Sequence, residues 1–235
     1  MALKGDVFDL CDITDAMIEE MYTLMGTYYE NVNRNRFYSD LKDKDKVLIL
    51  FDEENTIRGF TGIKAYDFEV GDVPVRLMFS GDTIIHQSYW GELQLPKLWI
   101  NMVYSLRDKA SRNYWLLISK GYKTYRFLPV CFYNFYPRYD SETPDFEQRI
   151  MDTFGRSFYP QDYDPRTGVI YMRGKKDYLK QGVSDLTEHR LKDPHVEFFM
   201  NKNPGQAVGD ELVCITELVL ENIKPLGRRF LRGGV

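Results

Sequence analysis

The chain has 235 residues, a length typical of one large domain or two small ones. Lysine and arginine total 31 and aspartate and glutamate 35, giving a net charge of −4. This near-balance argues against a nucleic-acid-binding protein, which normally carries a basic excess. The three cysteines lie far apart without a CxxC pair, so neither a disulfide framework nor a metal site is expected.

The sequence also argues against targeting to a membrane. The N-terminus lacks the apolar stretch of a signal peptide. The longest apolar runs, such as Val47–Phe51, fall far short of the roughly 20 residues that cross a bilayer. We therefore expect a cytoplasmic protein without a membrane span.

The first half predicts a helix followed by an antiparallel meander. Apolar residues at helical spacing predict a helix from Thr14 to Tyr29, and a charged stretch follows over 33–46. Val47–Phe51 is typical of a buried strand. Beyond turns rich in Asp, Asn and Gly, Ile57–Phe68 and Val75–Ile85 complete the meander.

The pattern then changes to alternating helices and strands. Apolar spacing predicts a helix over Leu93–Leu106, and Tyr114–Ser119 is typical of a short buried strand. A helix with an aromatic face is expected from Tyr122 to about Tyr136, with a kink or a late start at Pro129. Together these elements predict a mixed sheet with helices on its faces.

The last third has weaker patterns. We find no repeat or flexible linker, so residues 1–235 are expected to form one domain, with about 140–210 as an extension packed on it. The elements expected here are helices over Pro144–Phe154 and Asp193–Met200 and strands over Val169–Met172 and Glu211–Thr216.

The order of these elements resembles the GCN5-related N-acyltransferase (GNAT) superfamily. The resemblance is carried by the hairpin Val47–Phe68, the strand Val75–Ile85, the turn Ile85–Gly91 that opens a helix, and the strand Trp115–Ser119 with the helix after it. It implies an α/β fold whose mostly antiparallel sheet is splayed near Ile85 and Trp115, with helices on both faces. It also implies direct transfer of an acyl group from a thioester to an amine.

The tail is similar to the long-chain branch of that superfamily, which includes N-acyl amino acid synthases and fatty-acyl-transferring maturases of peptide natural products. Its matching segments are 163–169 and 198–205. This implies a medium- or long-chain acyl group and an amine of an amino acid or peptide as acceptor. The high aromatic content suits an acyl tunnel but equally an ordinary core, and we assign Phe79, Trp99, Phe132 and Tyr136 to the acyl pocket, with Trp90 beside them.

The turn after the long strand departs from the superfamily pattern, written roughly V-x-P-x-Y-R-G-x-G-x-G. Only Gly91 remains; Trp90 replaces the usual Arg or Gln, and Leu93 and Leu95 stand where glycines would be. A helix N-terminus can bind phosphate, and the glycines let the backbone wrap a pyrophosphate. We therefore expect weaker binding of coenzyme A, acetyl-CoA in particular, while the single phosphate of an acyl-carrier protein still fits. The residues expected to bind the donor, acyl-CoA or acyl-carrier protein, are Ile85, Trp90, Gly91, Glu92, Leu93, Lys120 and Lys123.

Candidate catalytic residues lie at the end of the same strand. Asp82 and His86 are four apart on a strand, so their side chains should share a face, with Asp82 orienting His86 as the base. The alternative interpretation is an ordinary turn aspartate and a surface histidine at the end of a strand. The resemblance implies an oxyanion held by a backbone N–H at a bulge near Asp82–His86 and a helix tyrosine that protonates the thiolate. We choose Tyr133 over Tyr125 and Tyr136 for that role.

Other candidates favour simpler readings. Cys131 is expected to be a buried core residue, and His189 and His195 to be ordinary polar residues, not metal ligands. Lys120 and Lys123 either lie on a solvated face or dock an acidic carrier protein. Two rivals to the main function remain: an autoinducer-type synthase that acylates a small amino-acid derivative, and a non-catalytic GNAT-like binding module.

Overall fold

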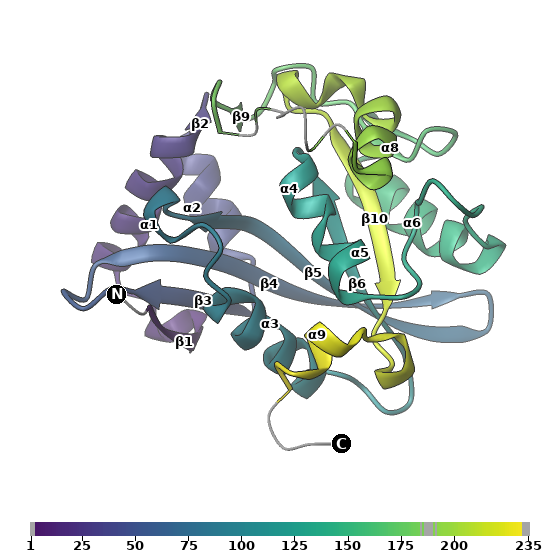
Figure 1. Ribbon diagram of the computed structural model, residues 1–235, viewed down its shortest axis with the longest axis horizontal. Coiled ribbons are helices and arrows are strands. Elements are labelled where there is room, and N and C mark those ends of the chain that lie inside the picture. Colours follow the sequence, from purple (N-terminus) through teal and green to yellow (C-terminus); the bar gives the residue numbers. More distant parts are fainter. Residues whose placement is uncertain (1–2, 184, 186–189, 191, 232–235) are drawn as a thin grey trace.

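The computed structural model describes residues 3–183, 185, 190 and 192–231. An eight-stranded sheet crosses the molecule in the order β1-β3-β4-β5-β6-β10-β8-β7 (Figure 1). Neighbours run antiparallel except β5 and β6, which are parallel. The strands are β1 (Lys4–Asp9), β3 (Lys46–Phe51), β4 (Ile57–Val70), β5 (Val73–Ile85), β6 (Arg112–Ser119), β7 (Tyr163–Asp164), β8 (Val169–Ile170) and β10 (Glu211–Glu217), and a separate pair joins β2 (Tyr29–Glu30) to β9 (Tyr178–Leu179).

Helices cover both faces of the sheet, because its strands alternate apolar side chains between the two. Val47 and Ile49 pack in the cluster under α1 and α2, while Leu48 and Leu50 pack in the cluster under α3. One face carries α1 (Asp15–Tyr28), α2 (Arg34–Lys42) and α6 (Asp145–Phe158); the other carries α3 (Gln94–Ser105), α4 (Tyr122–Tyr125), α5 (Phe127–Cys131), α8 (Pro194–Lys202) and α9 (Pro225–Arg228). The predicted fold class, an α/β protein with a mixed, mostly antiparallel sheet and helices on both faces, is confirmed.

The parallel pair parts halfway along β5. Its ladder runs from Val75 opposite Arg112 to Ser80 opposite Leu117, whereas β5 continues to Ile85. Beyond Ser80, β5 stays with β4, and β6 stays with β10. The predicted splaying is therefore present.

A β-bulge lies just past the point of separation. Gly81 pairs with Gly62 and Ile84 with Phe60, so β5 carries one residue more than β4 between these pairs. Asp82 has a φ of +51°, in the left-handed region. The extra residue reverses the side-chain alternation of the strand, and Ile84 packs in the α1 and α2 cluster.

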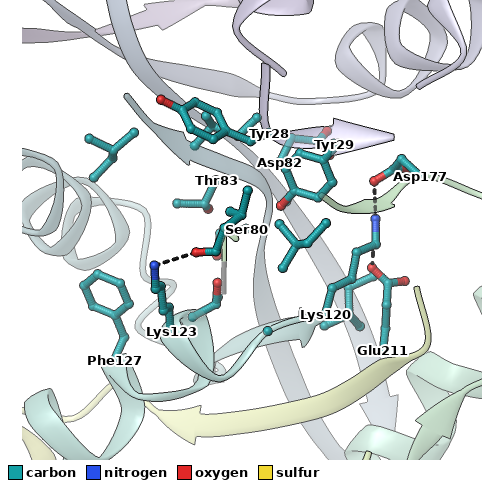
Figure 2. A pocket seen from close by; sticks show the side chains of 18 of the residues that line it. Tyr28, Tyr29, Ser80, Asp82, Thr83, Lys120, Lys123, Phe127, Asp177 and Glu211 are labelled. Atoms are coloured by element: carbon teal, nitrogen blue, oxygen red, sulfur yellow. Dashed lines mark hydrogen bonds and ion pairs between the residues drawn. The ribbon is translucent and has the colours of Figure 1, made fainter. Parts of the chain in front are cut away.

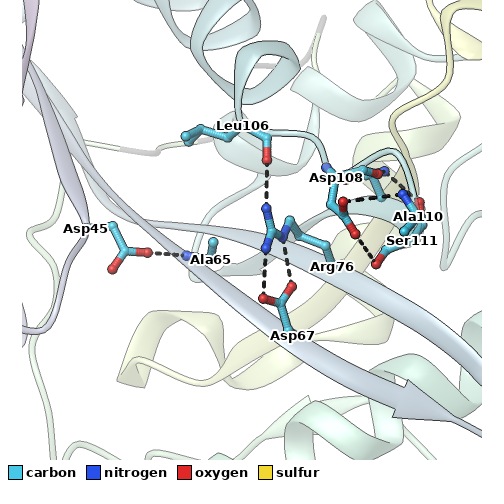
Figure 3. Close-up of polar contacts among 9 residues, drawn as sticks. Asp45, Ala65, Asp67, Arg76, Leu106, Asp108, Ala110 and Ser111 are labelled. Carbon is cyan, nitrogen blue, oxygen red and sulfur yellow. Dashed lines mark hydrogen bonds and ion pairs between the residues drawn. The ribbon is translucent and has the colours of Figure 1, made fainter.

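Polar contacts fix the paired end of β5 (Figure 3). The Arg76 guanidinium donates two hydrogen bonds to the Asp67 carboxylate, at 2.7 and 2.8 Å, and a third to the carbonyl of Leu106 at 3.3 Å. The turn that follows is held by Asp108, which accepts from the Ser111 hydroxyl at 2.5 Å. These contacts tie the end of α3 to the β4–β5 hairpin and so place β6 beside β5.

Two predicted elements need correction, and one helix was not predicted. The helix expected to reach Tyr136 ends at Cys131 and is interrupted at Arg126, between α4 and α5. Pro129, inside α5, has no N–H for the carbonyl of Tyr125, the last residue of α4. The chain then runs to Tyr136, whose N–H donates to the carbonyl of Ile215 at 2.8 Å. The strand expected over Val169–Met172 is only the two-residue β8. The charged stretch 33–46 contains a helix that the sequence analysis missed: α2, capped by the Asn33 side chain.

Candidate functional site

The separated part of the sheet encloses a candidate site. A cavity of about 900 Å³ lies between β5 beyond Ser80 and the end of β6, and α4, β2 and the turn before α3 complete its wall (Figure 2). Its size is in the range of pockets that bind small-molecule ligands. Charged side chains gather at one part of it and aromatic side chains at another.

A buried ion cluster joins the end of β6 to β10. The ammonium of Lys120 lies 2.5 Å from a carboxylate oxygen of Asp177 and 3.5 Å from one of Glu211. All three side chains are at most 14% exposed. Burial opposes the charge on Lys120, but the nearby Glu211 and Asp177 carboxylates outweigh it and hold the Lys120 pKa above its usual value. The cluster thus fixes the wall of the cavity on the β6 side.

Asp82 and Tyr29 line the cavity near this cluster (Figure 2). Burial raises the pKa of the Asp82 carboxyl, which makes it a better proton acceptor than an ordinary aspartate. Burial also raises the pKa of Tyr29 to about 12, against the opposing charge of Lys120, so this phenol keeps its proton at neutral pH. The site therefore holds a basic carboxylate and a protonated phenol.

The mouth beside α3 is built around Trp90. Its indole N–H donates to the carbonyl of Ile85 at 2.9 Å, and the Lys123 ammonium lies 3.7 Å from the centroid of its ring. Lys123 also donates to the carbonyl of Val183 at 2.6 Å. Burial, followed by the neighbouring Arg190, lowers the Lys123 pKa.

The apolar part of the cavity has two sections. Phe79, Tyr66 and Phe158 line the main cavity, and the last two rings are 4.6 Å apart. A smaller chamber of about 40 Å³ lies under α3, lined by Trp99 and Phe132 among others. Ser80, Thr83, Pro96, Thr124 and Phe127 line both spaces, which therefore adjoin.

The structure brings most of the predicted donor and acyl residues to these two spaces. The main cavity is lined by Ile85, Trp90, Gly91, Glu92, Leu93, Lys120, Lys123 and Phe79. Trp99 and Phe132 line the small chamber. Tyr136 lines neither of the two and packs instead beside the β5–β6–β10 cluster under α6.

The predicted catalytic residues are not brought together. Asp82 lines the cavity, but His86 is absent from its lining; His86 caps the short helix η2 (Gln87–Tyr89), where its Nδ1 accepts from the N–H of Ser88. The expectation that Asp82 and His86 share a strand face is wrong, because the bulge interrupts the alternation and β5 ends at Ile85. Tyr133 is 48% exposed, lies beyond the end of α5 and is also absent from the lining.

Lys120 does not lie on a docking face. Its side chain is 14% exposed and already pairs with two carboxylates, so the expectation that it meets an acidic carrier protein is wrong. Lys123 is exposed at the mouth. Of the two predicted lysines, Lys120 thus has a structural role, and Lys123 is accessible to a ligand.

Sequence reasoning missed Tyr29, Asp177 and Glu211. Tyr29 reaches the site because β2 pairs with β9, with Tyr29 opposite Leu179, and this pairing also brings Asp177 to the cavity. Glu211 is the first residue of β10 and directly precedes the apolar run Leu212–Ile215. A buried-strand pattern that opens on an acid was the signal available for it.

Other features of the described chain give no sign of a further reactive centre. Cys131 is buried, as expected, and burial raises its pKa to about 11. No group of three potential metal ligands comes together among the described residues, and His189 lies outside them. Within that same part of the chain, no helix is long and apolar enough to cross a membrane.

The sequence matches no known family description and no curated protein. Among solved structures, similarity is found to a probable N-acyltransferase from Enterococcus faecalis V583, with 12% identity and a TM-score of 0.42 over 54% of this chain and 32% of that one. A GNAT family N-acetyltransferase from Escherichia coli in complex with CoA gives 14% identity and 0.40 over 54% and 69%. The N-myristoyltransferase of Saccharomyces cerevisiae with bound myristoyl-CoA gives 11% and 0.41 over 51% and 29%. The chain thus spans about a third of the length of the first of these proteins, and such distant likenesses assign no function.

Proposed function

We propose that the protein is an N-acyltransferase that moves a medium- or long-chain acyl group from an acyl thioester to an amine of an amino acid or peptide. The observation that carries the proposal is the separated parallel pair, whose gap is a cavity with one charged and one aromatic part. An acyl thioester arm is extended and bears amide groups. The edge of β5 beyond Ser80, which has no partner on the β6 side, offers backbone groups to such an arm.

In this proposal Asp82 is the base. The amine nitrogen attacks the thioester carbonyl, the new C–N bond forms, the C–S bond breaks, and the proton lost by the nitrogen passes to the Asp82 carboxylate. The raised pKa of Asp82 supports this role, because a base works best when its pKa lies near the working pH. The acyl group passes directly to the amine without a covalent enzyme intermediate.

The oxyanion and the leaving sulfur are stabilised by hydrogen bonds in this proposal. A backbone N–H at the Asp82 bulge is our choice for the oxyanion, since donors fixed in advance stabilise developing charge well. A thiol has an ordinary pKa of about 8.5 and leaves readily. Tyr29, which keeps its proton, donates a hydrogen bond to the departing sulfur.

The aromatic sections support the chain-length part of the proposal. The acyl chain lies against Phe79, Tyr66 and Phe158 or enters the chamber of Trp99 and Phe132. Burying each methylene contributes about 0.8 kcal/mol, so a medium-length chain adds substantially to binding.

The test is amine-dependent thiol release from decanoyl thioesters, with a panel of amino acids, short peptides and small amino-acid derivatives as acceptors. We expect Asp82→Asn to lower the rate by about 10²-fold, the usual contribution of a general base. His86→Ala and Tyr133→Phe change residues outside the cavity lining and should retain most of the activity. Equal losses in all three variants would contradict the assignment of the base to Asp82.

One observation favours a non-catalytic binding module as the second candidate function. The turn before α3 uses most of its backbone N–H groups internally and so offers few to a ligand phosphate. Thioester binding without release of thiol in any acceptor mixture would support this alternative. Amine-dependent release would exclude it.

A further inference from the structure

The turn between β5 and α3 lies at the cavity mouth and determines which backbone N–H groups can bind the phosphate groups of a donor. Gly91, Glu92 and Leu93 from this turn line the cavity. A turn that leads into a helix binds a diphosphate through several backbone N–H groups that are free to point at it. The number of free N–H groups is therefore the quantity that matters here.

Most of these N–H groups already have partners inside the protein. The N–H of Gln87 donates to the Tyr28 hydroxyl at 2.7 Å, and that of Ser88 donates to the Nδ1 atom of His86 at 3.3 Å. Three more donate to backbone carbonyls three residues earlier in the turn: Tyr89 to His86, Trp90 to Gln87, and Glu92 to Tyr89, at 2.9 to 3.2 Å. Five backbone donors of the turn are thus used.

The start of α3 adds few donors. Leu93 precedes the helix without a side-chain cap, so the N–H groups of Gln94 and Leu95 stay uncapped, but Pro96 in the same turn has no N–H. The carboxylate of Glu92 lies just before the helix, where its charge opposes an anion. Gly91 has a φ of +102°, a left-handed conformation that other residues adopt only with strain, so glycine is needed there for the course of the backbone.

One cation at the mouth is not neutralised. Lys120 pairs with Asp177 and Arg126 with Asp193, but Lys123 has no carboxylate within ion-pair distance in the described parts of the chain. Its partners are a carbonyl and the ring of Trp90. The lowered pKa of Lys123 shows that its surroundings disfavour the charge, and a nearby anion would compensate for this.

We propose that the acyl donor is a phosphopantetheine thioester presented by a carrier protein, that recognition ends at its single phosphate beside Lys123, and that the nucleotide of coenzyme A is not recognised. The inference rests on the proposed function and specifies its donor. A phosphopantetheine arm carries one phosphate diester when attached to a protein, and Lys123, with Arg190 beside it, provides positive charge for that phosphate. Coenzyme A carries a diphosphate and a third phosphate, which need more free backbone N–H groups than the turn leaves.

The experiment compares three donors with the same acyl group by isothermal titration: decanoyl-pantetheine, decanoyl-4′-phosphopantetheine and decanoyl-CoA. We expect the single phosphate to tighten binding by about tenfold, as a charge-assisted contact does. The nucleotide should then change the affinity by less than about threefold. Adenosine 3′,5′-bisphosphate should not compete.

Matched variants identify the phosphate contact. Lys123→Ala should remove the gain from the phosphate and leave decanoyl-pantetheine binding unchanged. Lys44→Ala and Lys176→Ala remove cations from other walls of the same cavity and should keep the gain. A gain from the nucleotide of more than about tenfold, or competition by the bisphosphate, would overturn the inference while leaving the proposed function intact.

The last arm tests presentation by a protein. The decanoyl arm on a fatty-acid acyl carrier protein should bind at least as tightly as free decanoyl-4′-phosphopantetheine. Binding more than about tenfold weaker would overturn the carrier part of the inference. Absence of binding by all thioesters would overturn the proposed function and this inference together.

Discussion

The two halves of β5 have the same backbone partner on one side and opposite surroundings on the other. Val75–Ser80 lies between β4 and β6, and its apolar side chains are at most 8% exposed. Gly81–Ile85 still pairs with β4, but on its other side it borders the cavity instead of β6. One strand therefore serves as core and as candidate site, and the change occurs within a single residue step.

Different forces hold the two halves. The first is held by backbone ladders and apolar packing on both faces. The second half pairs with β4 alone, and on the β6 side of the cavity the Lys120 cluster joins the end of β6 to β10 and to the segment before β9. Charged side chains thus hold the wall that faces the open half. The two halves should respond differently to substitution.

The largest effect is expected where the ion cluster is broken. Lys120→Ala leaves Asp177 and Glu211 as buried carboxylates without their cation, and should lower the free energy of unfolding by about 3 kcal/mol. Denaturant unfolding measures it. Decanoyl-pantetheine binding should fall as well, because the cavity wall loses its support.

A combined variant separates lost charge from lost packing. Lys120→Met with Asp177→Asn and Glu211→Gln removes all three charges at similar volume, and should restore more than half of the lost stability. If the triple variant were as unstable as Lys120→Ala, the comparison would fail, because the open half would then depend on packing like the closed one.

The next effect lies at the fork itself. The Trp115 indole N–H donates to the Ser80 hydroxyl at 2.8 Å, in a buried contact at the last paired residue of β5. Ser80→Ala leaves this donor without a partner and should cost about 2 kcal/mol. Adding Trp115→Phe to Ser80→Ala removes the orphaned donor, so the double variant should lose less than the sum of the two single variants. An additive result in the double-mutant cycle would show that the contact does not couple the strands.

A stabilising effect is expected in the open half. Burial raises the pKa of Asp82, so the native state binds this proton more tightly than the unfolded state and the charged form costs stability at neutral pH. Asp82→Asn should therefore add about 1 kcal/mol near pH 7 while losing activity. The gain should shrink as the pH falls through the raised native pKa, and disappear below the ordinary aspartate value of 3.8. A gain that is independent of pH would exclude the carboxylate charge as its cause.

The contrast between the halves also separates what the sequence predicted from what it did not. The long periodic segments β3, β4, β5 and α3 were predicted close to their observed bounds, because apolar spacing over many residues is a strong signal. The residues that the resemblance assigned to donor binding all line the cavity. The bulge at Asp82 has no such signal, since one inserted residue changes no local composition.

The other features that the sequence did not predict depend on pairing between segments that are far apart in the chain. Asp177 and Glu211 meet Lys120 only because β9 pairs with β2 and β10 pairs with β6. The end of α5 depends on the bridge between Tyr136 and Ile215, which are far apart in the chain. Tyr133 was therefore predicted to lie on a helix, whereas the helix ends at Cys131, before Tyr133.

The smallest effect is expected at the closed end of β5. Arg76 donates two hydrogen bonds to Asp67, whose side chain is 64% exposed, and one to the carbonyl of Leu106. Arg76→Ala should cost about 1 kcal/mol, or about 2–4 °C in Tm, because solvent weakens the ion pair. Arg166→Ala is the matched control: it breaks another two-bonded pair, with Asp164, but Arg166 is 88% exposed and spans no elements, so Tm should hardly change.

The pH dependence identifies the Arg76 contribution. The hydrogen bonds from Arg76 hold the pKa of Asp67 below its usual value, so this pair stabilises the native state above the unfolded aspartate pKa. The stability is lost as the pH falls through the lowered native value. The difference in Tm between the wild type and Arg76→Ala should therefore narrow below about pH 4, leaving the part due to the Leu106 contact. A difference that stays constant into acid would show that Arg76 acts through α3 alone, and that the closed half, unlike the open half, does not depend on a charge.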